Sequence, residues 1–404
     1  MTTIKQEDFI QSIADAFQYI SYYHPLDYIQ ALGAAYEREQ SPAARDAIAQ
    51  ILTNSRMCAE GHRPICQDTG IGMVFIKVGM QVTWPDATMS IQKMIDEGVR
   101  RAYANPDNPL RASVLADPAG ARKNTKDNTP AVVHFEIVEG HHVEVICAAK
   151  GGGSEAKSKF AMLNPSDDLV DWVLHKIPEM GAGWCPPGII GIGIGGTPEK
   201  AMLLAKESIM APVDIHELKA KAAEFAKTGA KLTRAEELRL ELFEKINALG
   251  VGAQGLGGLT TVLDIKVRDY PTHAANLPVA MIPNCAATRH AHFTLDGSGP
   301  VMLDPPSLED WPSLTYSPQN ARRVDLDTLT REDVASWKPG EVLLLNGKLL
   351  TGLTPKQIDD LQNCLRNSQK TGRGIENQVD ELRREGIAFL RETIRTTFTF
   401  RDDP

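Results

Sequence analysis

The 404-residue sequence lacks long apolar segments and has little cysteine. No window approaches the roughly 18 uninterrupted apolar residues that suggest a membrane-spanning helix. The first residues, Met-Thr-Thr-Ile-Lys-Gln-Glu-Asp, lack the charged and apolar regions of a secretory signal. The six cysteines follow no pairing pattern, which argues against a disulfide framework and fits a reducing compartment. We therefore expect a cytoplasmic protein without a membrane partner.

The sequence also lacks an excess of positive charge. It has 43 Lys and Arg against 52 Asp and Glu, a net charge of −9. On average this surface repels nucleic acid, so an anionic substrate would need a local basic pocket. The length and the 42% of hydrophobic residues are enough for an ordinary core and for two domains.

Hydrophobic periodicity predicts a chain of mixed helices and strands. Helical spacing covers residues 6–56, 89–103, 169–176 and 214–248, and strand-like runs cover 73–78, 131–138, 142–148, 259–267 and 277–282. A helix is also expected to begin after Lys157, with Ser166 as a possible cap of the helix at 169–176.

Three single cysteines lie where the backbone is expected to be irregular. Cys66 occupies a polar turn before a buried strand, Cys185 lies in Gly-Trp-Cys-Pro-Pro-Gly, and Cys285 lies in Ile-Pro-Asn-Cys-Ala-Ala-Thr-Arg-His. Three thiolates on a metal or cluster would leave one coordination position open for catalysis. A lone cysteine is more often a small buried hydrophobe, and ligands about a hundred residues apart form no CxxC motif. The residues alone leave both interpretations open.

The glycines from Gly191 to Gly196 formally satisfy a dinucleotide-binding GxGxxG pattern. That interpretation is weak, because Cys-Pro-Pro stands just before the run and no strand ending in an acid follows at the required distance. We expect these glycines instead to let the backbone approach a buried group closely.

Four motifs occur in a fixed order along the chain: Ile-Cys-Gln-Asp-Thr-Gly, Ala-Ala-Lys-Gly-Gly-Gly-Ser-Glu, Cys-Pro-Pro-Gly with Gly-Ile-Gly-Gly-Thr, and Gly-Ala-Gln-Gly-Leu-Gly-Gly. Together they resemble the class I fumarate hydratases, an oxygen-sensitive family with a [4Fe-4S] cluster that is related to the L-tartrate dehydratases. The resemblance covers about residues 10–352.

The resemblance implies an α+β fold built around an iron–sulfur hydro-lyase catalytic domain at 1–303. A linker at 304–323 would lead to a partial β/β/α swivelling domain at 324–352 and a helical tail at 353–404. After Gly352 the family's Gly-Arg-Asp and later Gly-Pro-Thr-Thr segment are missing, so most of the second domain has no match.

The resemblance also implies the residues of the site. Cys66, Cys185 and Cys285 would bind three irons of the cluster and leave the fourth open as a Lewis acid. Gln67 and Asp68 would contact the substrate hydroxyl and the water, with Asp68 as the candidate catalytic acid or base. The other implied substrate-binding residues are Arg111, through its guanidinium, Gly153, through its backbone N–H, and His273.

The remaining cysteines, Cys58, Cys147 and Cys364, lie outside the motifs and are assigned to packing. The implied reaction is the reversible hydration of fumarate to L-malate, a step of the tricarboxylic acid cycle. L-Tartrate or another dicarboxylate is the alternative substrate. The protein would be a homodimer, or a cluster-binding subunit that is inactive until a separate chain supplies the second domain. The sequence decides neither the substrate, nor the base that removes the C3 proton, nor whether the shortened chain is active alone.

Overall fold

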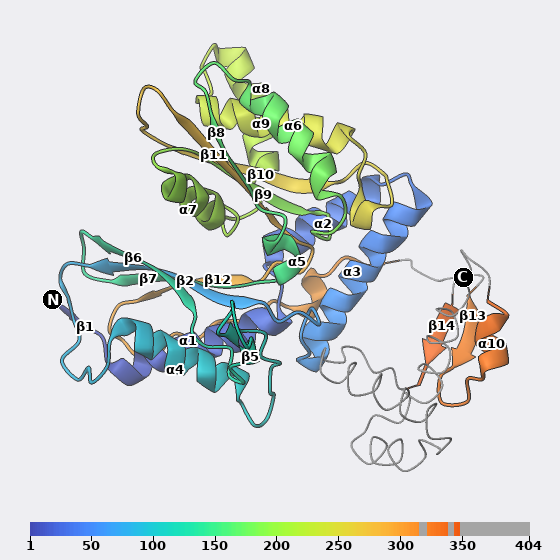
Figure 1. The fold of residues 1–404 in the computed structure, drawn as a ribbon, viewed down its shortest axis with the longest axis horizontal. Coiled ribbons are helices and arrows are strands. Elements are labelled where there is room, and N and C mark those ends of the chain that lie inside the picture. The colour runs from blue at the N-terminus through green and yellow to red at the C-terminus, as the bar shows by residue number, and fades with distance from the viewer. Residues whose placement is uncertain (315–320, 338–342, 348–404) are drawn as a thin grey trace. The chain divides into compact units, whose positions relative to one another are not determined.

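The computed structural model describes residues 1–314, 321–337 and 343–347 (Figure 1). The chain divides into one compact unit at Met1–Leu314 and a second at Thr315–Pro404. The predicted helical tail and Cys364 lie outside the described residues.

The first unit contains two four-stranded mixed sheets, so the chain combines helices and sheets as an α+β protein does. In the first sheet the order is β12-β7-β2-β6, and in the second it is β10-β9-β11-β8. The strands of the first sheet are β2 (Ile71–Gly79), β6 (Val132–Val138), β7 (Val143–Lys150) and β12 (His290–Leu295). Those of the second are β8 (Lys159–Leu163), β9 (Gly188–Gly195), β10 (Val262–Tyr270) and β11 (Leu277–Asn284).

Helices α1 (Gln6–Tyr22) and α4 (Ile91–Tyr103) cover the outer face of the first sheet (Figure 1). The helical spacing of Phe9, Ile13 and Phe17 places these side chains in a common core with β2 and β7. Helices α2 (Leu26–Arg38) and α3 (Pro42–Gly61) complete the predicted helical N-terminal region.

Helices α6 (Leu169–Met180), α8 (Ile215–Thr228) and α9 (Arg234–Ala248) cover the second sheet (Figure 1). A capping box fixes the start of α9, because the Thr233 side chain accepts from the Glu236 N–H while the Glu236 side chain accepts from the Thr233 N–H. Leu238, Leu242 and Ile246 of α9 then pack onto the sheet.

Helix α7 (Pro198–Ser208) lies between the two sheets (Figure 1) and shares a core with side chains of both. A Cβ on Gly191 would lie 2.3 Å from the Ala205 carbonyl oxygen, and one on Gly193 would lie 1.9 Å from that of Ala201. The close backbone approach predicted for these glycines is therefore confirmed, and the group that they approach is α7.

Two local predictions are wrong, and in the two four-stranded sheets the strands β9 and β12 were not predicted. Residues after Lys157 form strand β8, since Lys-Phe-Ala-Met-Leu pairs along β11 instead of starting a helix. The cap of α6 is Asp168, whose side chain accepts from the Asp171 N–H, and not Ser166. Strand β12 begins shortly after the polar segment that contains Cys285. Its apolar residues are too few to have predicted a strand.

Shorter elements complete the two units. In the first unit they are β1 (Thr2–Thr3), β3 (Val82–Thr83), β4 (Leu115–Ala116), β5 (Lys123–Asn124), α5 (Gly152–Glu155), η1 (Ala253–Gly255) and η2 (Leu308–Asp310). In the second they are β13 (Arg322–Asp325), α10 (Arg331–Ala335) and β14 (Leu343–Asn346), with β13 and β14 paired in parallel. No helix in the described ranges has both the length and the apolar character needed to span a membrane.

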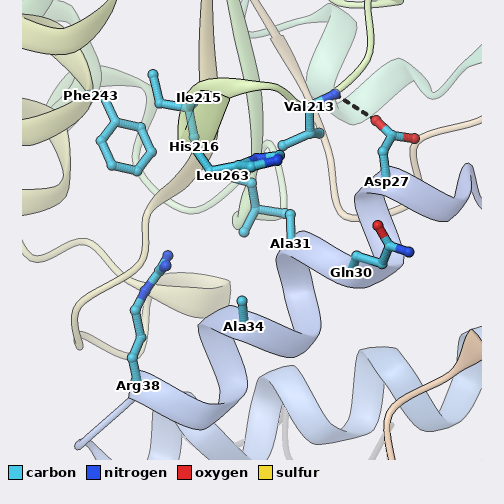
Figure 2. Close-up of a pocket in the computed structure, with 10 residues that line it drawn as sticks. All are labelled: Asp27, Gln30, Ala31, Ala34, Arg38, Val213, Ile215, His216, Phe243 and Leu263. Carbon is cyan, nitrogen blue, oxygen red and sulfur yellow. Dashed lines mark hydrogen bonds between the residues drawn. The ribbon is translucent and has the colours of Figure 1, made fainter. Parts of the chain in front are cut away.

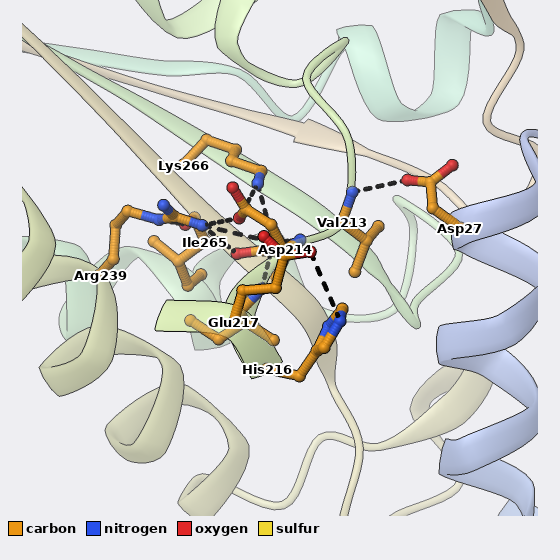
Figure 3. A network of polar contacts seen from close by, with 10 residues as sticks. Asp27, Val213, Asp214, His216, Glu217, Arg239, Ile265 and Lys266 are labelled. Carbon is orange, nitrogen blue, oxygen red and sulfur yellow. Dashed lines mark hydrogen bonds and ion pairs between the residues drawn. The ribbon is translucent and has the colours of Figure 1, made fainter. Parts of the chain in front are cut away.

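A buried ionic network fastens α8 and α9 to β10 (Figure 3). Asp264 is fully buried and forms ion pairs with Arg239 at 3.1 Å and Lys266 at 2.9 Å. Both cations also pair with Asp214, just before α8. The carboxylate of Asp264 further accepts from the backbone N–H groups of Asp214 and Ile215, at 2.8 and 3.1 Å.

Candidate functional site

The loops that carry the predicted site meet where several strands begin or end. In the first sheet, Ile71 at the start of β2 pairs with Lys150 at the end of β7, and His290 at the start of β12 pairs with Ala148. Residues 66–70, 151–153 and 285–289 are therefore neighbours at one end of this sheet.

The second sheet brings the other cysteine loop to the same place. Cys185 shortly precedes β9 and Cys285 directly follows β11, and these strand ends pair at Ile189 and Asn284. The Ala286 N–H donates to the Cys185 carbonyl at 2.9 Å. Because residues 285–289 connect β11 to β12, the site lies at the junction of the two sheets.

The three thiols are free and lie close enough to affect one another electrostatically. Burial raises the pKa of Cys66, Arg289 opposes that rise, and Cys285 adds to it. Burial also raises the pKa of Cys185, with further contributions from the charges of Cys285 and Cys66. Cys185 has φ of 57°, a rare conformation for a residue with a side chain. Its N–H donates to the Ala182 carbonyl at 2.9 Å, so hydrogen bonds on both sides hold this backbone.

Asp68 links the Cys66 loop to the glycine segment. One carboxylate oxygen accepts from the Gly70 N–H at 2.9 Å, and the other accepts from the Gly152 N–H at 2.7 Å. The first contact is an Asx turn, and the second orients the carboxylate across the site. Arg111 is exposed and donates to the Gln67 carbonyl, which places its guanidinium beside the same loop.

The glycine segment at residues 151–153 is closely packed against neighbouring loops. A Cβ on Gly151 would lie 3.1 Å from the Asp68 carboxylate, and a Cβ on Gly153 would lie 3.3 Å from the Gly183 carbonyl. Gly183 belongs to the turn that carries Cys185. Gly153 thus lies between the Cys66 and Cys185 loops, and a larger residue there would push against the second.

Two buried cations border the site, and the sequence gave neither of them a role. The side chain of Lys150 donates to Ser154 at 2.8 Å and forms an ion pair with Glu155 at 3.2 Å. Burial lowers the pKa of Lys150 to about 8, although Glu155 opposes that shift. Arg289 is 3% exposed and donates to the Asp68 carbonyl at 2.7 Å.

A chain of hydrogen bonds supports the Cys285 loop from behind. The Trp311 indole donates to the Ser55 hydroxyl at 3.0 Å, Ser55 contacts His24 Nδ1 at 2.8 Å, and His24 Nε2 contacts the Ala286 carbonyl at 3.0 Å. Burial lowers the pKa of His24 to about 4. The ring is therefore neutral, with Nε2–H donating to Ala286 and Nδ1 accepting from Ser55. No motif indicated this residue.

His273 does not lie with the thiols within one chain. It occupies the turn between β10 and β11, and the last residue of β10, Tyr270, pairs with Gly195 at the far end of β9. Cys185 precedes the opposite end of that eight-residue strand, so about 26 Å of strand separates the two ends. The hydrogen bonds given for His273 stay in its own turn, where its Nδ1 accepts from the Ala275 N–H at 3.2 Å and its carbonyl accepts from the Asn276 N–H at 3.0 Å.

The two other described cysteines are packing residues, as expected. Cys58 is 4% exposed in α3 and Cys147 is fully buried in β7. Within the described residues, no three histidine, cysteine or acidic side chains are placed to share one metal ion.

A cavity of about 270 Å³ lies elsewhere, between α2, α8, α9 and β10 (Figure 2). Its lining is largely apolar, with Asp27, Arg38 and His216 as its charged or titratable residues. None of its lining residues belongs to the cysteine or glycine loops, so we do not assign it to the site.

Comparison with known proteins identifies the same family that the four motifs resemble. The model of the family described as "Fumarate hydratase (Fumerase)" matches residues 10–294, and that of "Fumarase C-terminus" matches 297–379. The second match extends past residue 352, where the motif resemblance ends.

Two relatives align with similar shares of this chain. The putative L(+)-tartrate dehydratase subunit alpha of Methanocaldococcus jannaschii is 34% identical over 287 residues, which is 69% of this chain and 94% of the relative. The L(+)-tartrate dehydratase subunit alpha of Escherichia coli K12 is 29% identical over 296 residues, which is 70% of this chain and 91% of the relative. The chain therefore belongs to the fumarate hydratase family and is a hydro-lyase.

Proposed function

We propose that this hydro-lyase catalyses the reversible hydration of fumarate to L-malate with a [4Fe-4S] cluster held by Cys66, Cys185 and Cys285. One observation carries the proposal. Three loops that are far apart in the sequence meet at the junction of two sheets, and each brings one free thiol. An iron–sulfur cluster is the cofactor expected of this family.

The donor set fits a cluster better than it fits a single ion. Cys285 contributes to the raised pKa values of Cys66 and Cys185, yet the three thiols do not converge as the ligands of one ion would. In a cubane cluster each thiolate binds a different iron, so the ligands stand farther apart. When bound, a cluster with three protein ligands supplies an open Lewis-acidic iron.

The chain's own residues would bind and orient the dicarboxylate. Arg111 is exposed beside Gln67 and offers a planar fork of donors that matches a carboxylate. Gln67 is also exposed, and its amide would hydrogen-bond the substrate hydroxyl. Gly153 lacks a side chain at the narrow position between the loops, so its backbone N–H would be reachable by the substrate. These contacts fix the reacting carbons relative to Asp68.

Asp68 is the proposed acid or base of this chain. Its carboxylate is held by the N–H groups of Gly70 and Gly152, so it faces the site in one orientation. A fixed carboxylate two residues after Cys66 can take a proton from the water that adds, or return one to the hydroxyl that leaves.

The proposed role of His273 requires a second copy of the chain. Within one chain a whole strand separates this residue from the thiols. A homodimer in which His273 of one copy faces the thiol site of the other would satisfy both proposals.

L-Tartrate is the second candidate substrate, because the relatives from M. jannaschii and E. coli carry the name of a tartrate dehydratase. Their designation as alpha subunits also supports a separate partner chain that would complete the site. A dicarboxylate substrate is common to both candidates.

The test begins with anaerobic reconstitution of the full chain with iron and sulfide. L-Malate dehydration is then followed by fumarate absorbance, and L-tartrate dehydration by oxaloacetate formation. We expect Cys66→Ser to abolish activity and Cys58→Ala, a matched cysteine outside the site, to retain it. A cluster-loaded chain that turns over L-tartrate alone would refute the fumarate assignment. One that turns over neither acid would refute activity of the chain alone.

A further inference from the structure

Within the described residues, Arg289 is a buried cation that has no ion-pair partner. Its side chain lies in the connection from β11 to β12, four residues after Cys285, and is 3% exposed. Nη1 donates to the Asp68 carbonyl at 2.7 Å, while Nε and Nη2 are buried without a hydrogen-bond partner.

The neighbouring cation, Lys150, shows how unusual this is. It is equally buried, yet it has an ion pair with Glu155 and a hydrogen bond to Ser154. An unpaired buried charge is strongly destabilising, and two unpaired donors add to that cost. The environment of Arg289 is therefore built for an anion that the amino acids alone do not supply.

The position of Arg289 indicates which anion would compensate its charge. Its charge acts on the Cys66 thiol, and its one hydrogen bond holds the backbone of Asp68, two residues further on. A Cβ on Gly151 would lie 3.7 Å from Nη2, so the guanidinium lies beneath the glycine segment. Because Nε and Nη2 are out of reach of solvent, a dicarboxylate that enters from solution would not touch them. An anion held at the Cys66 thiol could instead be offset by this charge without touching these atoms.

We propose that Arg289 is a positioning residue for the iron–sulfur cluster, which fixes the Cys66 loop and offsets the negative charge of the thiolate-bound cluster. This inference rests on the proposed function. It assigns cluster retention to Arg289 and dicarboxylate binding to Arg111, although both guanidinium groups contact the same loop.

The experiment compares Arg289→Met, Arg289→Gln and, as the matched control, Arg111→Met, all as full chains reconstituted anaerobically. Iron and acid-labile sulfide per chain are measured, and then the rate of iron release to a chelator. Loss of a group that supports metal ligands typically costs tenfold to a hundredfold in affinity, so we expect both Arg289 variants to release iron at least tenfold faster than wild type. Arg111→Met should release iron at the wild-type rate.

Thermal unfolding of the cluster-free proteins checks that the variants fold. If Arg289→Met does not fold, Arg289→Gln decides, because it keeps a polar donor in the buried site without the charge. A folded Arg289 variant with wild-type iron content and release rate would overturn the inference and leave the proposed function intact. A wild-type chain that takes up no cluster would overturn both.

Discussion

Replacing Asp264 with alanine should destabilise the protein severely, because this carboxylate forms ion pairs with Arg239 and Lys266, which Figure 3 labels. Asp264 is fully buried and compensates Arg239 and Lys266, at 3.1 and 2.9 Å. Its removal leaves two largely buried cations with only the Asp214 carboxylate between them. It also removes the acceptor of two N–H groups at the start of α8. Breaking a buried ion pair on one side typically costs about 3–5 kcal/mol.

The assay is urea unfolding of the cluster-free chain, followed by circular dichroism and tryptophan fluorescence. The control is Lys219→Ala, which breaks an ion pair with Glu244 whose side chains are 45% and 67% exposed. An exposed pair contributes at most about 1 kcal/mol. The two variants should therefore differ by several-fold in their loss of free energy of unfolding. If Asp264→Ala lost no more than Lys219→Ala, the reasoning about buried charge would be refuted.

Three further predictions concern the support and the substrate side of the site. The pKa of His24 is about 4 in the folded chain, against an ordinary value of 6.5. As the pH falls from 6.5 towards 4, the unfolded chain takes up a proton at His24 and the folded chain does not. About 3 kcal/mol of the free energy of unfolding is therefore present above pH 6.5 and lost over this range. In His24→Gln the free energy of unfolding should fall less between pH 7 and 4 than it does in the wild-type chain. Equal falls in the two proteins would contradict this prediction. Gly193→Ala should lower the free energy of unfolding by at least about 1–3 kcal/mol, because its Cβ would meet the Ala201 carbonyl at 1.9 Å. The control Gly61→Ala should cost less, because its Cβ would meet only the Arg63 side chain, at 3.5 Å. Arg111→Met should raise KM for the dicarboxylate at least tenfold in steady-state kinetics, and an unchanged KM would remove Arg111 from substrate binding.

The fold was largely predictable wherever one residue pattern dominated. Helical spacing located α1, α4 and α9, and apolar runs located β2, β7 and β11. Strand β8 was mistaken for the start of a helix because five residues carry too little periodicity, and its pairing with β11 is a long-range contact. The close approach at Gly193 was foreseen as a property of glycine, but its partner, α7, was not.

The site was predictable in its residues but not in its geometry. Motif order singled out Cys66, Cys185 and Cys285, whereas only the strand pairings bring their loops together. The same pairings carry His273 away from the thiols, even though it stands close to Cys285 in the sequence. That Arg289 has no ion-pair partner among the described residues cannot be read from the sequence, because it depends on every side chain that surrounds the guanidinium.

The most direct test of the cluster assignment is the iron and sulfide content of the anaerobically reconstituted chain, measured beside a variant in which Cys66, Cys185 and Cys285 are all serine. The assignment predicts a full [4Fe-4S] complement in the wild-type chain and background values in the triple variant. Equal iron and sulfide in the two proteins would contradict it.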